Sequence, residues 1–95
     1  MLKITLHDSS RELLFRLEGR LAGLWSGELL QCWRTASSTT EGRRTVVDLA
    51  DVDFVDAGGR QVLQEMHGAG VEFVAATPLI QTLVQEIRGH GLSAA

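Results

Sequence analysis

Four aspartates lie close together in the middle of the chain, and their spacing is the first feature that could carry chemistry. They are Asp48, Asp51, Asp53 and Asp56. Closely spaced carboxylates open the calcium-binding loops of EF-hand proteins, but those loops also need a glycine at the sixth position and a glutamate at the twelfth. The chain has neither residue there, so we interpret the aspartates as a helix cap and a solvated turn. We expect no metal site and no acid–base pair of carboxylates.

The other reactive side chains are scattered along the sequence. His7, His67 and His90 do not pair at the spacing of metal ligands, and the last two fall near the ends of predicted helices. Cys32 lies on the apolar stripe of a predicted helix, which favours an inert core thiol. The chain has no Gly-x-Ser-x-Gly and no Walker sequence. The sequence therefore indicates neither an enzyme nor a bound cofactor.

Length and composition indicate one small folded domain over residues 1–95. The formal net charge of −3 is mild and gives no electrostatic footprint for nucleic acid or for an acidic membrane surface. No apolar run is long enough for a signal peptide or a membrane span. We expect a cytoplasmic protein without membrane insertion.

The periodicity of apolar residues predicts the element order ββαβαβα. Strands are expected at residues 2–6, 13–18, 45–50 and 71–76, and helices at 24–37, 58–67 and from Pro78 to about 89. Gly19 and Gly23 are expected to break the second strand, and residues 51–55 to form a connection. The nearly continuous apolar run at 45–50 is typical of a strand buried on both faces under helices. The fold class is therefore α/β, with a mixed sheet and helices packed on it.

Residues 56–59, which we call the Asp56 corner, connect this buried strand to the following helix. Asp56 stands at the N-cap, where its carboxylate accepts a hydrogen bond from the backbone of Gly58 or Gly59 and contributes about 0.5–2 kcal/mol relative to alanine. Its charge also opposes the positive end of the helix dipole. Glycines cost about 1 kcal/mol each inside a helix, so two of them suggest that something must approach the backbone closely.

Residues 46–59, with the sequence VVDLADVDFVDAGG, resemble the central motif of STAS domains, the family of bacterial anti-sigma-factor antagonists. That motif is an apolar strand ending in Asp-Leu, a short connection, and Asp-Ser-(Ser/Thr)-Gly at the start of a helix. Gly19-Arg20-Leu21 resembles the family's Gly-Glu-Leu, and residues 71–92 resemble its last strand and helix. The resemblance covers nearly the whole chain and implies a STAS-like fold.

The same resemblance implies a function that depends on one residue. In the family, a partner kinase that is also the anti-sigma factor phosphorylates the serine after the aspartate, and the phosphate switches binding off. Here that position is Ala57, and the next is Gly58, so this switch cannot operate. The resemblance thus implies a non-enzymatic protein–protein interaction module that binds constitutively. Its partner would be a kinase-like anti-sigma factor in transcription regulation, or the ATPase of a lipid-transport ABC complex to which the chain is an accessory subunit.

The expected partner-binding face combines the Asp56 corner with the exposed side of the helix that follows it. It comprises Asp56, Ala57, Gly58, Gly59, Arg60, Gln61 and Gln64. The alternative is a small-ligand or nucleotide-binding domain that uses the same helix N-terminus as an anion site. Trp25 is either a core residue, like Trp33, or an exposed interface anchor. A homodimer and phosphorylation in the polar loop at residues 37–40 also stay open.

Overall fold

Strands and helices follow one another in the predicted order ββαβαβα in the computed structural model, which describes residues 1–38 and 42–93 (side chains to residue 89). The elements are β1 (Leu2–Asp8), β2 (Glu12–Leu21), α1 (Leu24–Ser37), β3 (Arg44–Val55), α2 (Ala57–Gly68), β4 (Glu72–Val74) and α3 (Pro78–Ser93). This order confirms the α/β class. The predicted bounds of α1 agree with the structure, whereas several strand and helix ends do not.

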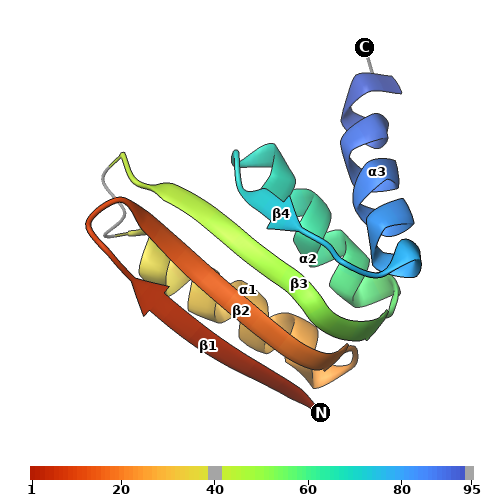
Figure 1. Cartoon of the computed structure of the whole chain (residues 1–95), viewed down its shortest axis with the longest axis horizontal. Helices are drawn as coiled ribbons and strands as arrows, with labels where there is room; N and C mark the ends of the chain where they lie inside the picture. Colours follow the sequence, from red (N-terminus) through yellow and green to blue (C-terminus); the bar gives the residue numbers. More distant parts are fainter. Residues whose placement is uncertain (39–41, 94–95) are drawn as a thin grey trace.

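The strands form one mixed sheet in the order β1-β2-β3-β4. β1 and β2 are an antiparallel hairpin, whereas β2 with β3 and β3 with β4 are parallel pairs. Parallel neighbours need a long crossover, and α1 and α2 provide the two crossovers. Figure 1 shows α1 and α2 behind the sheet, with α3 beside α2 next to β4.

The core lies between the sheet and the helices. Along β2, Leu13, Phe15 and Leu17 are almost completely buried, because side chains in a strand alternate between the two faces. On the helices, the buried apolar side chains are Leu29, Val62, Leu63, Met66, Ile80, Val84 and Ile87. These residues form one cluster with the strands. Because β2, β3 and β4 run parallel and each is followed by a helix, all three helices start at the same end of the sheet.

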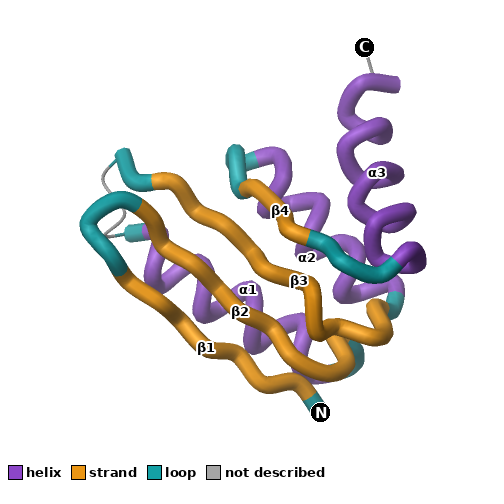
Figure 2. The backbone as a smooth tube through the Cα atoms, viewed as in Figure 1, coloured by secondary structure: helices purple, strands orange, loops and turns teal. Residues whose placement is uncertain are grey.

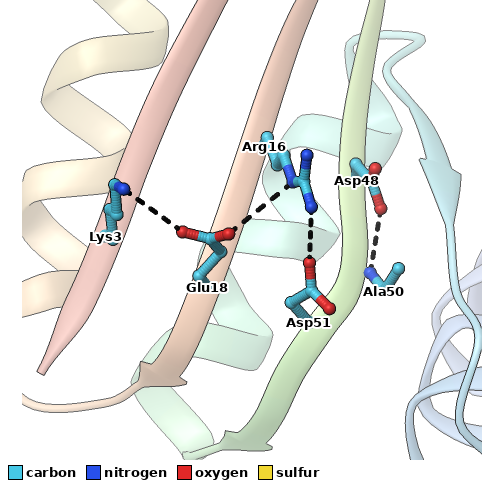
Figure 3. Close-up of polar contacts among 6 residues, drawn as sticks. All are labelled: Lys3, Arg16, Glu18, Asp48, Ala50 and Asp51. Atoms are coloured by element: carbon cyan, nitrogen blue, oxygen red, sulfur yellow. Dashed lines mark hydrogen bonds and ion pairs between the residues drawn. The ribbon is translucent and has the colours of Figure 1, made fainter.

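No described helix covers the opposite face of the sheet (Figure 1), so the prediction of helices over both faces of the third strand is wrong. Figure 3 shows charged side chains on this face, with α1 and α2 behind the strands. Arg16 Nη2 lies 2.9 Å from Asp51 Oδ2, and Lys3 Nζ lies 3.7 Å from Glu18 Oε2. Val46 is buried among its strand neighbours on this face, which explains the continuous apolar run without a second helical layer.

β3 continues through Asp51–Val55, where the sequence predicted a connection. Its pairing with β2 shifts at two places, and at the first of them Arg16 lies opposite Asp48 while Glu18 lies opposite Asp51. β3 therefore carries an extra residue, which is a β-bulge. The Asp48 carboxylate accepts a hydrogen bond from the Ala50 backbone N–H at 2.9 Å and so stabilises the bulge (Figure 3).

Other predicted element ends are also wrong. β2 passes through Gly19, whose φ of 106° is easy for glycine alone and brings it close to the Met1 carbonyl. β4 is shorter than predicted. α3 continues to Ser93, past the glycines expected to end it, so His90 lies inside the helix.

Cys32 is exposed, so the prediction of a core thiol is wrong. α1 buries the stripe that contains Leu29, and Cys32 lies roughly a quarter-turn away from the middle of that stripe. Trp25 and Trp33 are partly buried and pack against the core cluster, which favours the core interpretation of both. Cys32 instead lines a hollow together with Leu6 and Asp8, at the end of β1.

Candidate functional site

The Asp56 corner joins the starts of two helices through one carboxylate. Asp56 Oδ1 accepts a hydrogen bond from the Gly59 backbone N–H at 2.7 Å, which confirms the predicted N-cap of α2. Asp56 Oδ2 accepts from the Gly23 N–H at 2.9 Å, immediately before α1. The Asp56 backbone N–H donates to the Leu21 carbonyl at 3.1 Å. The end of β2, the end of β3 and both helix starts are thereby fixed to one another.

These hydrogen bonds hold the pKa of Asp56 below its usual value. The Gly23 N–H lowers the pKa most and the Gly59 N–H comes next, whereas partial burial raises it. The buried Ser26 hydroxyl also lowers the pKa, although it makes no well-formed hydrogen bond to any described residue. The corner therefore carries a negative charge throughout the neutral pH range.

The two glycines of the corner have different roles. Gly58 is exposed, and a Cβ atom there would lie 3.5 Å from Asp56 Oδ1, an ordinary contact distance. Gly59 is buried, and its Cβ would lie 2.7 Å from the Leu21 carbonyl oxygen and 2.9 Å from Leu21 Cγ. Gly59 is therefore required by the packing of α2 against β2. Of the two residues, Gly58 alone leaves backbone open to a partner.

The remaining predicted site residues divide between the surface and internal contacts. Ala57 and Gln61 are exposed and lie one helical turn apart on α2. Arg60 is engaged within the domain, because its Nη2 lies 2.7 Å from Glu86 Oε2 on α3. Gln64 is partly buried one turn further along. The exposed start of α2 is thus small and uncharged apart from Asp56.

Exposed apolar residues outside the predicted site lie near this start. Leu24 follows Gly23 and is 89% exposed, and Leu79 at the start of α3 is 65% exposed. Leu79 and the partly exposed Phe54 line a cleft of about 260 Å³ together with Arg60. Both leucines lie off the apolar stripe of their helices. That position in the sequence could have marked them as exposed apolar residues. The carboxyl end of the sheet therefore presents an acidic cap flanked by apolar side chains.

Among the side chains that the structure describes (residues 1–38 and 42–89), no three His, Cys, Asp or Glu residues are grouped so that they could hold a metal ion. At the α2 N-terminus, Asp56 already fills the place of an anion, and its charge opposes a second one. No described helix is long and apolar enough to cross a membrane.

No family model matches the chain, and no curated protein matches it. Among solved structures, the anti-sigma factor antagonist SpoIIAA in its unphosphorylated form has a TM-score of 0.65 at 14% sequence identity, over 88% of this chain and 83% of that chain. An antisigma-factor antagonist STAS domain from Rhodobacter sphaeroides has a TM-score of 0.57 at 21% identity, over 79% of this chain and 85% of that chain. The fold is therefore that of SpoIIAA and STAS domains, as the sequence resemblance predicted.

A further similar structure is much longer than this chain. Mglu has a TM-score of 0.59 at 22% identity, over 78% of this chain but only 19% of its own length. The chain thus spans about a fifth of that protein, which shows the same fold within a larger molecule. Because the sequence identities to these three structures are low, the comparisons show the fold alone.

Proposed function

We propose that this chain is a non-enzymatic protein-interaction module of the STAS type that binds a partner protein through the Asp56 corner. One observation carries the proposal: the charged helix start, held by hydrogen bonds from Gly23 and Gly59 to Asp56, has the exposed Leu24 next to Gly23 and the exposed Leu79 next to Arg60. Exposed apolar groups around a fixed polar centre are typical of protein interfaces. The contact face consists of Asp56, Ala57, Gly58 and Gln61, with Arg60 and Gln64 behind it.

The partner class comes from the fold. SpoIIAA is named as an anti-sigma factor antagonist, and we infer that the partner here is a regulatory protein of the anti-sigma type in the bacterial cytoplasm. An ATPase subunit of a transport complex is the second candidate of the same class. Binding is constitutive in this proposal, because the methyl group of Ala57 has no oxygen to carry a phosphate.

Two glycines at opposite ends of α2 allow a matched test. Tagged protein is purified from the source cells, the bound protein is identified, and its affinity for Gly58→Trp and Gly68→Trp is measured by calorimetry. Both positions are exposed, and a Cβ atom meets only ordinary contacts at Gly58 and no atom within 4 Å at Gly68, which lies at the far end of the helix. We expect Gly58→Trp to weaken binding at least tenfold and Gly68→Trp to leave it unchanged. Equal affinity of both folded variants would place the contact elsewhere.

Binding of a nucleotide or another small anion at the α2 N-terminus is the alternative function. The buried Ser26 hydroxyl without a good hydrogen bond supports it, because such a group can donate to a ligand. The negative charge of Asp56 opposes it, so we place it second. Saturable heat on titration with ATP or GTP would favour this alternative, and flat titrations of wild type and Asp56→Asn would exclude it for those ligands.

A further inference from the structure

Within the described residues, β1 leaves a long edge of the sheet unpaired. The strand order places β1 at the margin with β2 as its partner, and Figures 1 and 2 show no described element along its outer side. All positions of Leu2–Asp8 pair with β2 in one continuous antiparallel register, without a bulge. The strand also contains no proline. A regular edge of this kind exposes backbone N–H and C=O groups that another strand can pair with.

The other edge of the sheet is different. β4 covers only Glu72–Val74, and the Phe73 carbonyl accepts a hydrogen bond from Arg88 Nη2 on α3 at 3.5 Å. A short edge that is partly covered by a helix is a usual protection against pairing. β1 has neither of these features in the part of the chain that the structure describes.

Apolar side chains extend to the exposed edge on the helix side of β1. Leu2 is buried, Ile4 is partly buried, and Leu6 is 47% exposed. Leu6 borders a hollow of about 490 Å³ between β1, β2 and α1, whose other lining residues are Asp8, Leu13, Gln31, Cys32, Thr35 and Ala36. Among the described residues of this lining, Asp8 is the only charged one, and it forms an ion pair with Arg43. The hollow is therefore suited to an uncharged, apolar occupant.

We propose that this occupant is a second copy of the chain, whose β1 pairs with this β1 in antiparallel orientation about a two-fold axis at Thr5. Side chains alternate between the two faces along a strand. The helices of both copies therefore lie on the same side of the joined sheet only if even-numbered residues of one β1 lie opposite even-numbered residues of the other. An axis at Thr5 uses the whole strand, whereas an axis at Ile4 or Leu6 pairs only residues 2–6 or 4–8.

The pairing is self-complementary at its centre. Ile4 of each copy lies opposite Leu6 of the other, and Thr5 lies opposite Thr5 of the second copy, a favourable cross-strand combination. Lys3 keeps its ion pair with Glu18 on the open face of the sheet. The exposed part of Leu6 and the hollow beside α1 then become covered. The dimer has one continuous sheet, and the Asp56 corner of each copy lies outside the contact.

Sedimentation of the purified chain over a concentration series tests the proposal, with two matched variants. Leu6→Lys places like charges in the pairing, whereas Val74→Lys changes a residue of similar exposure (48%, against 47% for Leu6) on the other edge. We expect wild type and Val74→Lys to reach twice the mass of one chain, and Leu6→Lys to stay monomeric and folded. A monomeric wild type, or a dimer that tolerates Leu6→Lys, would overturn the proposal.

Disulfide cross-linking in a Cys32→Ser background tests the register. Thr5→Cys brings two thiols within reach of each other across the axis, whereas His7→Cys separates them by about 13 Å along the strands. We expect oxidation to link Thr5→Cys into a dimer and to leave His7→Cys unlinked. The reverse result would refute an axis at Thr5. Leu6→Lys should keep its affinity for the partner of the Asp56 corner, so the two proposals fail independently.

Discussion

Asp56 connects local helix chemistry to the tertiary structure. Its carboxylate uses one oxygen to cap α2 through Gly59 and the other to bind the Gly23 N–H before α1. The first bond is a feature of the local sequence, but the second joins residues far apart in the chain. The residue therefore both orders the proposed contact surface and gives it a charge.

The lowered pKa of Asp56 predicts a pH dependence of stability. The folded-state pKa lies below the unfolded value of about 3.9, so between these values the unfolded chain binds a proton that the folded chain does not. The contribution of the charge is complete above the unfolded pKa and is lost as the pH falls through the folded pKa. Urea unfolding of wild type and Asp56→Asn from about pH 7 to about pH 2 should show a difference that shrinks toward acid. A difference that is independent of pH would contradict this assignment.

Neighbouring glycines at the start of α2 should respond in opposite ways to alanine. Gly59→Ala forces a Cβ against the Leu21 carbonyl, and we expect a loss of about 1–3 kcal/mol in the free energy of unfolding. Gly58→Ala meets only ordinary contacts in a helical conformation and should gain about 0.4–1 kcal/mol. Denaturant unfolding of both variants measures the two effects, and equal changes would show that packing does not distinguish the two positions.

Among the elements, β3 decides how the corner is presented. Before the first shift in register, the residues of β3 that face the core have odd numbers, namely Val47 and Leu49. Beyond that shift, the core-facing residue is Val52, which has an even number. Val55, opposite Leu21, follows the second shift. Each extra residue exchanges the two faces of the strand, because side chains alternate with a period of two. The strand thus ends with the orientation that delivers Asp56 to the start of α2.

The bulge in β3 should depend on Asp48 more than on the neighbouring aspartate. Asp48→Ala leaves the partly buried Ala50 N–H without its acceptor, and we expect a loss of about 1 kcal/mol in the free energy of unfolding. Asp51→Ala is the control, because its ion pair with Arg16 is exposed and should contribute about 0–1 kcal/mol at low salt and less at high salt. The prediction fails if Asp51→Ala costs more than Asp48→Ala in high salt.

At the scale of the whole molecule, one buried cluster includes residues from each of the three helices and from β1, β2, β3 and β4. We therefore predict one cooperative unit over the chain. Trp25 and Trp33 both lie on α1, so tryptophan fluorescence follows one helix, while far-ultraviolet circular dichroism follows all of the secondary structure. The two signals should give the same urea midpoint. Separate midpoints would show that α1 unfolds independently of the rest.

The sequence by itself determined the features that depend on near neighbours. The order of elements, the span of α1 and the cap of α2 by Asp56 follow from apolar periodicity and from hydrogen bonds within one helical turn. Thr77 and Pro78 likewise marked the start of α3. The position of the Asp56 corner at the carboxyl end of the sheet could therefore be predicted before the structure was known.

Tertiary structure alone decided the features that depend on residues distant in the sequence. The pairing of β2 with β3 determined the positions of the bulges and the residue at which β3 ends. The close contact of Leu21 with the Gly59 backbone makes Gly59 an internal packing residue. Three further features depend on which elements became neighbours. They are the hydrogen bond between Gly23 and Asp56, the exposure of Cys32, and the edge of β1 that no described strand pairs with. The physical reason is that periodicity reports which side of an element is apolar, whereas the element that covers that side is chosen by packing across the whole chain.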